Sequence, residues 1–200
     1  MCNFYRVKPK RGAQAGVRER VSAMAEESGA RLVRKSDAGL VVLPDRRVVA
    51  MRWGFRRDFG DAVNNARSDK LEGGMWSEAF RDRRCVIPVS VFYEWGSGEG
   101  GRKQAYEFCH ADDDYLWMAG VWEEHGSLGP CYSMVTTSAG PAMAGIHDRM
   151  PAILATDADA ATFLRGAAWR FVPYQGELAV SPCVSPLARP AADDGQAELF

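Results

Sequence analysis

Between residues 85 and 137 the sequence contains a succession of short apolar segments, and this succession most restricts the folds open to the chain. Val, Ile, Phe, Tyr and Trp dominate the segments, which is the composition of β-strands. The glycine-rich residues 96–101 separate two of them and are expected to form a hairpin loop. The predicted strands cover residues 85–88, 89–95, 105–110, 116–122 and 132–137. We therefore expect a β-rich domain.

Helical patterns are fewer and shorter. Val17, Val21 and Met24 share one face when residues 13–27 are drawn as a helix, so an amphipathic helix is predicted there. The other predicted elements are a short helix over 75–83, a helix from Thr156 or Asp157 to Leu164 or Arg165, a strand pair over 40–43 and 47–53, and a strand over 178–184. Together they indicate the α+β class, with one domain over 1–185 and a flexible tail over 186–200.

Composition excludes several classes of protein. The 200 residues are 46 % hydrophobic and 10 % aromatic, which excludes global disorder. The formal net charge of −1 excludes a chain-wide basic surface for nucleic acid, although a local patch is compatible with it. Neither a membrane-spanning run nor a signal peptide is recognisable, so a cytoplasmic protein is expected. The 5 cysteines and 3 histidines lack metal-ligand spacing, so we expect reduced thiols and no metal or cofactor.

Cys2 has distinctive chemistry if Met1 is removed. It then carries a free α-amine, with an ordinary pKa of about 7.7–8.0, next to a thiol with an ordinary pKa of about 8.5. Such a 1,2-aminothiol condenses with an aldehyde through a Schiff base and closes to a thiazolidine ring, which an internal cysteine cannot do. The alternative is that position 2 holds a small residue by chance.

Three further segments contain candidate site residues. Glu94 lies among aromatic residues in V-S-V-F-Y-E-W, where desolvation would raise its pKa toward the range of a general acid; a surface residue at a strand end is the alternative. His147 and Arg149 in G-I-H-D-R-M-P suit proton transfer beside a phosphate, unless they form an ordinary polar loop. Asn65 and Arg67 lie in V-N-N-A-R-S-D, although two consecutive asparagines usually mark a turn.

Taken in order, these segments resemble the SRAP family, the SOS response-associated peptidases, which are also described as abasic-site processing proteins. The resemblance covers roughly residues 2–185. It rests on the M-C start, R-W-G-F, N-A-R-S-D, R-C-V-I-P-x-x-x-F-Y-E-W, A-G-V-W, T-T-S-A and I-H-D-R-M-P. The E-W block and the I-H-D-R-M-P block are specific in combination, whereas the M-C start alone is not.

The resemblance implies a central barrel-like mixed sheet and an enzyme that acts on DNA. Family proteins recognise abasic sites in single-stranded DNA and form a covalent thiazolidine crosslink, which at Cys2 requires removal of Met1. By resemblance, Asn65 holds the linkage, Glu94 acts as acid and base, and His147 assists ring opening and crosslink reversal. Arg67 and Arg149 correspondingly grip the flanking phosphates. We expect a monomer with lyase-like crosslinking activity; peptidase activity, including autoproteolysis of Met1, is compatible with the resemblance.

The sequence departs from the family pattern mainly where DNA is held. Cys2 is followed by Asn3-Phe4 in place of Gly-Arg, and Asp69 stands where a glutamate is expected. An Asn-x-Ala-Pro segment is missing before R-W-G, and a Trp- and Pro-rich loop is replaced by R-R-D-F-G. In that loop we expect Arg56 and Arg57 to contact DNA, and Phe59 to act as an aromatic wedge that unstacks a base.

Two other functions remain open. A cysteine peptidase would pair Cys2 with His147, but it gives no role to Glu94 or to the phosphate-type arginines. A non-catalytic nucleic-acid-binding module with a decayed site would not need all of Cys2, Asn65, Glu94 and His147. Crosslinking to an abasic oligonucleotide, compared with turnover of a peptide library, separates these functions.

Overall fold

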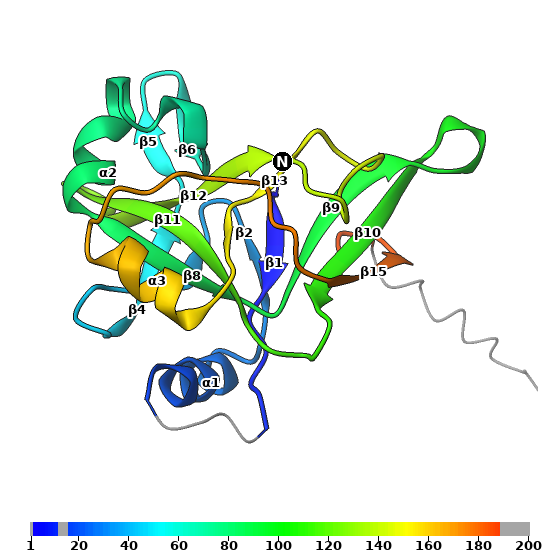
Figure 1. Ribbon diagram of the computed structural model, residues 1–200, viewed down its shortest axis with the longest axis horizontal. Coiled ribbons are helices and arrows are strands. Elements are labelled where there is room, and N and C mark those ends of the chain that lie inside the picture. The colour runs from blue at the N-terminus through cyan, green and yellow to red at the C-terminus, as the bar shows by residue number, and fades with distance from the viewer. Residues whose placement is uncertain (1, 12–15, 189–200) are drawn as a thin grey trace, which may run out of the picture.

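The fold is rich in β-structure, as the sequence predicts. The computed structural model describes residues 2–11 and 16–188. In these ranges the helices are α1 (Val17–Glu27), α2 (Ser77–Asp82) and α3 (Asp157–Leu164), and strands make up most of the remaining regular structure (Figure 1). None of these helices combines the length and the apolar character needed to cross a lipid bilayer. The predicted α+β class is confirmed.

A closed ring of strands forms the centre of the molecule. In the ring each strand pairs with the next, and β12 closes it by pairing with both β11 and β4. The pairing of β4 with β12 is parallel, whereas the other pairs are antiparallel, so the barrel is mixed. Its strands are β3 (Ala38–Val42), β4 (Val48–Trp53), β8 (Arg84–Val89), β11 (Leu116–His125) and β12 (Gly129–Ser138). The barrel-like mixed sheet implied by the resemblance is confirmed.

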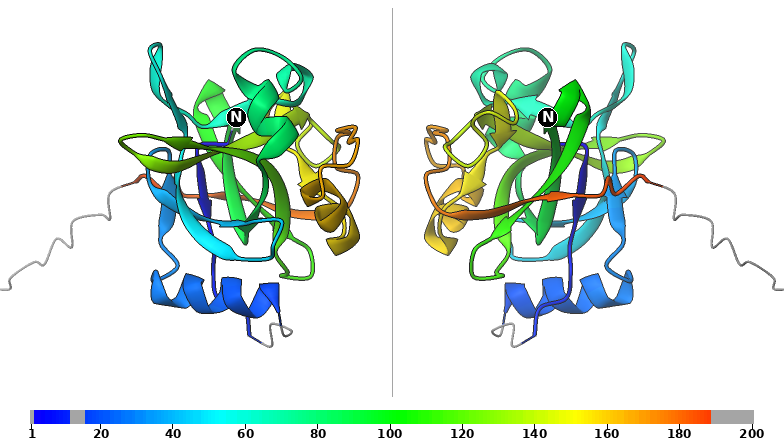
Figure 2. Two further views of the ribbon diagram at one scale, coloured as in Figure 1. Left: turned by 90° about the vertical axis from the view of Figure 1, so that its left-hand side faces the viewer. Right: turned by 90° about the vertical axis from the view of Figure 1, so that its right-hand side faces the viewer.

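A second sheet leaves the barrel where β8 ends. Ser90 separates β8 from β9, and its Oγ accepts a hydrogen bond from the backbone N of Lys8 at 2.8 Å, which joins the N-terminal segment to this corner. The second sheet has the order β15-β10-β9-β1-β2. Its strands are β1 (Phe4–Arg6), β2 (Leu32–Arg34), β9 (Val91–Ser97), β10 (Lys103–His110) and β15 (Leu178–Cys183). The β9–β10 hairpin projects from the body, and α1 lies at the opposite end of β1 from the chain start (Figures 1 and 2).

Short elements complete the fold. The strand β7 (Asn65–Arg67) pairs in parallel with β12, and β13 (Arg149–Pro151) pairs with the same strand in antiparallel fashion. These two pairings place the N-A-R and D-R-M-P segments against one barrel strand. The remaining short elements are the strands β5 (Phe55–Arg57), β6 (Gly60–Val63) and β14 (Ile153–Leu154) and the 3-10 helices η1 (Ser68–Lys70), η2 (Gly74–Trp76) and η3 (Glu99–Gly101).

Most of the predicted elements are present with small boundary shifts. The Thr156 hydroxyl caps α3 by accepting from the backbone N of Asp159, whose carboxylate accepts from the backbone N of Thr156, so the predicted helix start is confirmed. α1 begins at Val17, and residues 13–15 of the predicted helix lie outside the described ranges. Of the predicted tail, residues 186–188 form a turn region, and residues 189–200 lie outside the described ranges.

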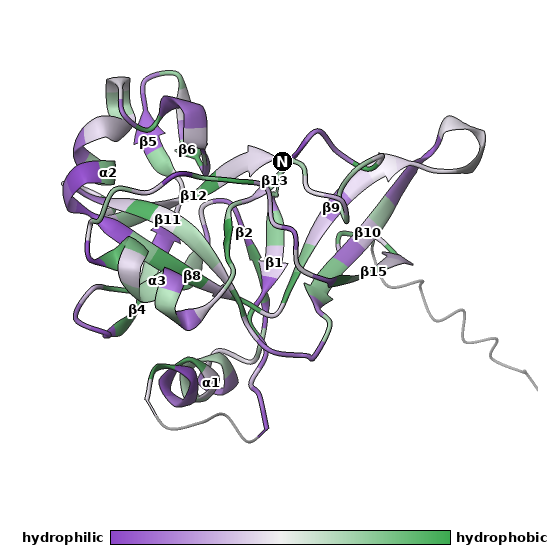
Figure 3. Cartoon of the chain, in the orientation of Figure 1, coloured by the Kyte–Doolittle hydropathy of each residue, from purple (hydrophilic) through white to green (hydrophobic). Residues whose placement is uncertain are grey.

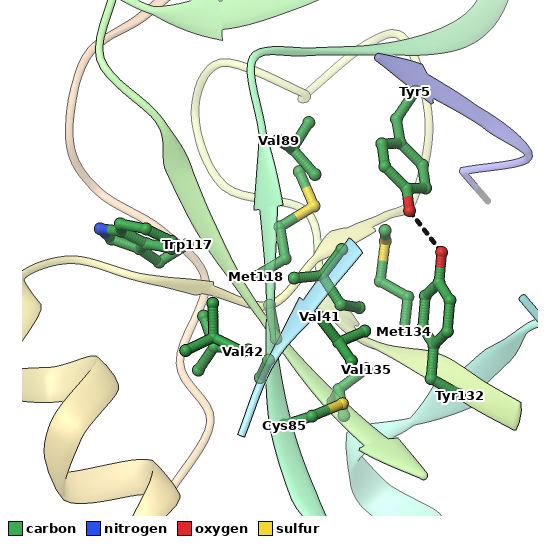
Figure 4. Close-up of a cluster of buried hydrophobic side chains, with 14 of the residues drawn as sticks. Tyr5, Val41, Val42, Cys85, Val89, Trp117, Met118, Tyr132, Met134 and Val135 are labelled. Atoms are coloured by element: carbon green, nitrogen blue, oxygen red, sulfur yellow. Dashed lines mark hydrogen bonds between the residues drawn. The ribbon is translucent and has the colours of Figure 1, made fainter. Parts of the chain in front are cut away.

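The core joins the barrel to the N-terminal strand. Apolar residues follow the central strands, whereas α1 carries polar residues on its outer face (Figure 3). The hydroxyl groups of Tyr5 on β1 and Tyr132 on β12 form a buried hydrogen bond within this core (Figure 4). The ring of Trp53 packs edge-on against Tyr5, with 5.0 Å between centroids, and is stacked parallel to Tyr132. This aromatic group fixes β1 against the barrel.

Gly39 on β3 is required by the tyrosine pair. A Cβ atom at this position would lie 2.1 Å from the Tyr5 Oη atom and 2.2 Å from the Tyr132 Oη atom. We expect Gly39→Ala to lower the free energy of unfolding by about 2–4 kcal/mol, because it overpacks the core and separates a buried hydrogen bond. Urea unfolding measures this change. Gly73→Ala is the control, since Gly73 has an extended φ of −134° and a Cβ atom added there would meet no atom within 4 Å; equal midpoints for the two variants would contradict the prediction.

Candidate active site

Cys2 is buried immediately before β1. Its side chain is 1 % exposed, and its Sγ lies 3.4 Å from the backbone oxygen of Phe4, to which it donates. Burial, together with the negative charge of nearby Glu94, raises the pKa of the Cys2 thiol to about 12. The sulfur is therefore held as a thiol, and a reaction at this atom needs a group that takes its proton.

Two neighbouring asparagines hold the backbone of Cys2. The Asn65 Nδ2 atom donates to the Cys2 carbonyl oxygen at 2.9 Å, and Asn64 Nδ2 donates to the same oxygen at 3.3 Å. Asn64 Nδ2 also lies 3.3 Å from Asn3 Oδ1, its second acceptor. The interpretation of the asparagine pair as a turn is wrong, because Asn65 begins β7 and Asn64 is buried just before it.

Asn65 also presents an unused acceptor. Its Oδ1 atom is buried and has no hydrogen-bond partner among the described residues. A buried amide oxygen of this kind is costly unless a donor reaches it. Asn65 thus fixes Cys2 with one end of its side chain and offers the other end to a group that approaches the site.

Glu94 lies on β9, the strand that pairs with β1. Its side chain is buried, so the interpretation as a surface residue at a strand end is wrong. Burial raises the pKa of the Glu94 carboxyl group above its ordinary value. A carboxyl group with a raised pKa holds its proton more firmly than an ordinary glutamate, and it can give that proton to a leaving group and take one back.

His147 faces Glu94 from the segment before β13. The Nε2 atom lies 3.7 Å from Glu94 Oε1. On the other side of the ring, Nδ1 lies 3.0 Å from the backbone N of Arg149 and 2.8 Å from Asp148 Oδ1. Nδ1 accepts from the Arg149 N–H group when it carries no hydrogen and donates to the Asp148 carboxylate when it carries one.

The two arginines of the N-A-R and D-R-M-P segments come together beside this group. Arg149 donates from Nη2 to the Thr136 backbone oxygen at 2.5 Å, and its Nη1 atom lies 3.9 Å from Asp69 Oδ1. Arg67 donates to both oxygens of Asp69, from Nε at 3.1 Å and from Nη2 at 2.9 Å. One carboxylate therefore lies between two guanidinium groups. Neither Asn64 nor Asp69 was predicted as a site residue, although Asn64 adjoins Asn65 and Asp69 lies two residues after Arg67.

The remaining predicted DNA-contacting residues lie on the β5–β6 hairpin. Arg57 donates from both terminal nitrogens to Glu123, each at 2.6 Å, and Arg56 Nε is 3.6 Å from Asp61 Oδ1. Phe59, at the tip, is 76 % exposed. The partners of Arg56 and Arg57 are thus Asp61 and Glu123 rather than residues of the Cys2 site, and the hairpin stands apart from β9 in Figure 1. Their part in DNA binding remains a prediction.

The arrangement therefore consists of a thiol, a carboxylate and an imidazole at one end of a small mixed barrel, with two arginines beside them. Within residues 2–11 and 16–188, no group of three or more His, Cys, Asp or Glu side chains is placed to hold a metal ion. A small mixed barrel with a cysteine, a glutamate and a histidine at one end, and with an arginine pair beside them, is the class of protein that the fold and the site define.

Comparison with known proteins specifies the family. The family model of the SOS response associated peptidase (SRAP) matches residues 6–179, and the chain belongs to this family. It is 32 % identical over 146 residues to the abasic site processing protein HMCES of Xenopus tropicalis, a match that covers 56 % of this chain and 43 % of that protein. It is 30 % identical over 121 residues to the abasic site processing protein YoqW of Bacillus subtilis (strain 168), covering 55 % and 54 % respectively. The matched segments thus span about half the length of these relatives.

Solved structures share the fold. A crystal structure of a protein from Bacteroides thetaiotaomicron has a TM-score of 0.71 at 18 % sequence identity, covering 92 % of this chain and 93 % of that one. One from Bordetella bronchiseptica has a TM-score of 0.70 at 20 % identity, covering 92 % and 100 %. At these identities the likeness concerns the fold alone.

Proposed function

We propose that the protein recognises abasic sites in single-stranded DNA and crosslinks to them through Cys2 after removal of Met1. The observation that carries the proposal is the position of Cys2, whose carbonyl is held by Asn65 while its thiol lies near Glu94. Its relatives named abasic site processing proteins support an abasic site as the substrate. The proposed partner is DNA, and no cofactor takes part in the steps below.

The chemistry follows from the two nucleophiles of Cys2. In its open form, the sugar of an abasic site carries an aldehyde. The α-amine attacks the aldehyde carbon, a C–N bond forms, and water leaves to give a Schiff base. The thiol sulfur then adds to the imine carbon, and the thiol proton moves to the imine nitrogen. The product is a thiazolidine, and the net loss is one water molecule.

Glu94 and His147 supply the proton transfers in this scheme. A Glu94 carboxyl group with a raised pKa can protonate the departing hydroxyl group and, as carboxylate, accept the proton of the Cys2 thiol. Opening of the sugar ring also needs a proton donor and an acceptor. His147, with Nε2 at 3.7 Å from Glu94 Oε1, is placed to exchange protons with it. The Asn65 Oδ1 atom, which has no hydrogen-bond partner among the described residues, can accept from a hydroxyl or N–H group of the adduct.

The peptidase alternative needs a ready thiolate, and burial disfavours one. With its pKa raised to about 12, the Cys2 thiol is almost entirely protonated at neutral pH. The crosslinking scheme tolerates this state, because the amine makes the first attack and the thiol reacts only after the imine has formed. Burial of the thiol therefore favours crosslinking over peptide hydrolysis.

A denaturing gel tests the proposal. The full chain, with loss of Met1 verified by mass spectrometry, is mixed with a single-stranded oligonucleotide that contains one abasic site. We expect a heat-stable shifted band, because a thiazolidine is covalent. The matched oligonucleotide with an intact base should give no shifted band, since it has no aldehyde. Absence of the band with the abasic strand would overturn the proposal, and turnover of a peptide library instead would favour the peptidase.

A further inference from the structure

We propose that Asp69 is a built-in competitor of the DNA backbone, which occupies the guanidinium groups of Arg67 and Arg149 in the free protein and weakens binding of unreacted strands. The inference rests on the proposed function, because it assigns these arginines to phosphates. It adds a mechanism that weakens the binding of DNA phosphates by these two arginines. A strand would be retained mainly through the covalent step, and an intact strand would leave easily.

The geometry of Asp69 resembles that of a bound phosphate group. Its two carboxylate oxygens accept from Nε and Nη2 of Arg67, the paired donors with which arginine binds a phosphate. On its other side, Oδ1 lies 3.9 Å from Arg149 Nη1. The carboxylate therefore occupies the Arg67 donors that a DNA phosphate would need, and it lies within ion-pair range of Arg149.

The charges agree with this competition. Hydrogen bonding to Arg67 lowers the pKa of Asp69 to about 2, so the carboxylate stays charged at any physiological pH. The pKa of Arg149 is lowered by burial and by the positive charge of Arg67, which places the two cations within each other's field. A single anion between them reduces the local charge that attracts a strand.

Exposure makes the exchange feasible. The side chains of Arg67 and Asp69 are about half exposed, at 54 % and 49 %, so a phosphate can approach the pair from solvent. Exposed ion pairs of this kind are weak and readily replaced. Arg149, by contrast, is held by Thr136 and stays in place when Asp69 releases it.

Binding of an unreactive strand at several salt concentrations tests the inference. The probe is single-stranded DNA with a tetrahydrofuran in place of the abasic sugar, which has no aldehyde and cannot crosslink. We expect Asp69→Asn to bind this strand roughly two- to fivefold more tightly at low salt, as expected for loss of one exposed competing ion pair. The plot of log K against log salt should be steeper by about 0.7, since one more net phosphate contact is made.

The control variants separate competition from other effects. Asp69→Glu retains the charge and should keep the wild-type slope. Asp45→Asn makes the same charge change at an aspartate that pairs with the arginine two positions later, Arg47, in the β3–β4 turn, and it should also keep that slope. Asp69→Ser should reproduce the steeper slope of Asp69→Asn with a smaller side chain.

The outcomes of this test are distinct. If Asp69→Asn binds the unreactive strand no better than the wild type while the wild type crosslinks abasic DNA, the competitor role is overturned and the proposed function stands. Weaker binding by Asp69→Asn would also overturn the competitor role and leave the proposed function standing. It would indicate that Asp69 positions Arg67 for DNA. If the wild-type protein neither binds the strand nor crosslinks abasic DNA, the proposed function itself fails.

Discussion

Cys2→Ala is expected to abolish the heat-stable crosslink to abasic DNA completely. The variant retains an α-amine once Met1 is removed, so it can still form a Schiff base, but no sulfur is present to close the ring. The Schiff base is hydrolysed on denaturation unless it is first reduced. A denaturing gel, run with and without prior borohydride reduction, measures both species.

Two further proteins control for the chemistry of the N-terminus. Cys2→Ser keeps a small polar side chain and should give only the reducible adduct. A chain with a residue left ahead of Cys2 has no free α-amine on Cys2 itself, so it should not form the thiazolidine. Both comparisons require unchanged folding, because Cys2 is buried, and circular dichroism checks this. A stable crosslink formed by the chain with a blocked α-amine would refute the thiazolidine mechanism.

Glu94→Gln is expected to slow crosslink formation by about 10²–10⁴-fold, the usual contribution of general acid–base catalysis. Glutamine keeps the shape and much of the hydrogen bonding of the side chain but cannot transfer a proton. Noncovalent binding of the strand that carries tetrahydrofuran should remain nearly unchanged. Single-turnover crosslinking gives the rate, and binding to the unreactive strand gives the affinity.

The pH dependence provides a second measure of the role of Glu94. Burial raises the pKa of its carboxyl group, so the protonated form persists to higher pH than for an ordinary glutamate. A step that uses this proton should therefore slow as pH rises through the raised pKa, and Glu94→Gln should lack that dependence. His147→Gln is the comparison, and it should affect crosslink reversal more than formation. If Glu94→Gln crosslinks at the wild-type rate throughout, the proton transfer belongs to another group.

The sequence predicted the elements whose residues repeat at regular spacing. The long strands and α3 have clear apolar patterns or a capping residue, so their positions could be derived from local chemistry. β1 could not, because three residues are too few to show a period, and the strand exists through its pairing with β2 and β9. Closure of the barrel likewise depends on the parallel pairing of β4 with β12, which joins segments far apart in the sequence.

The candidate site was predictable residue by residue but not as an arrangement. Glu94 and His147 were identified from their neighbours and the family pattern. The distance of 3.7 Å between Glu94 Oε1 and His147 Nε2, by contrast, follows from the way β9 and the segment before β13 meet. Asn64 and Asp69 were missed as site residues because their roles depend on partners. Asn64 gains its role by contact with Cys2 and Asn3, and Asp69 gains its role because β7 and β13 pair with the same strand.

If the proposed crosslink forms at Cys2, the position of β1 has a mechanical consequence. Any pull on the DNA would enter the protein at the start of this strand. β1 is hydrogen-bonded on both sides, and the Tyr5–Tyr132 bond ties it to the barrel. A force along the strand therefore acts in shear on the backbone hydrogen bonds to β2 and to β9 at the same time. An edge strand, which is paired on one side only, would resist such a force less. A motor that moves along the DNA would meet an anchor seated inside a sheet, and we expect the barrel to resist unravelling from that end.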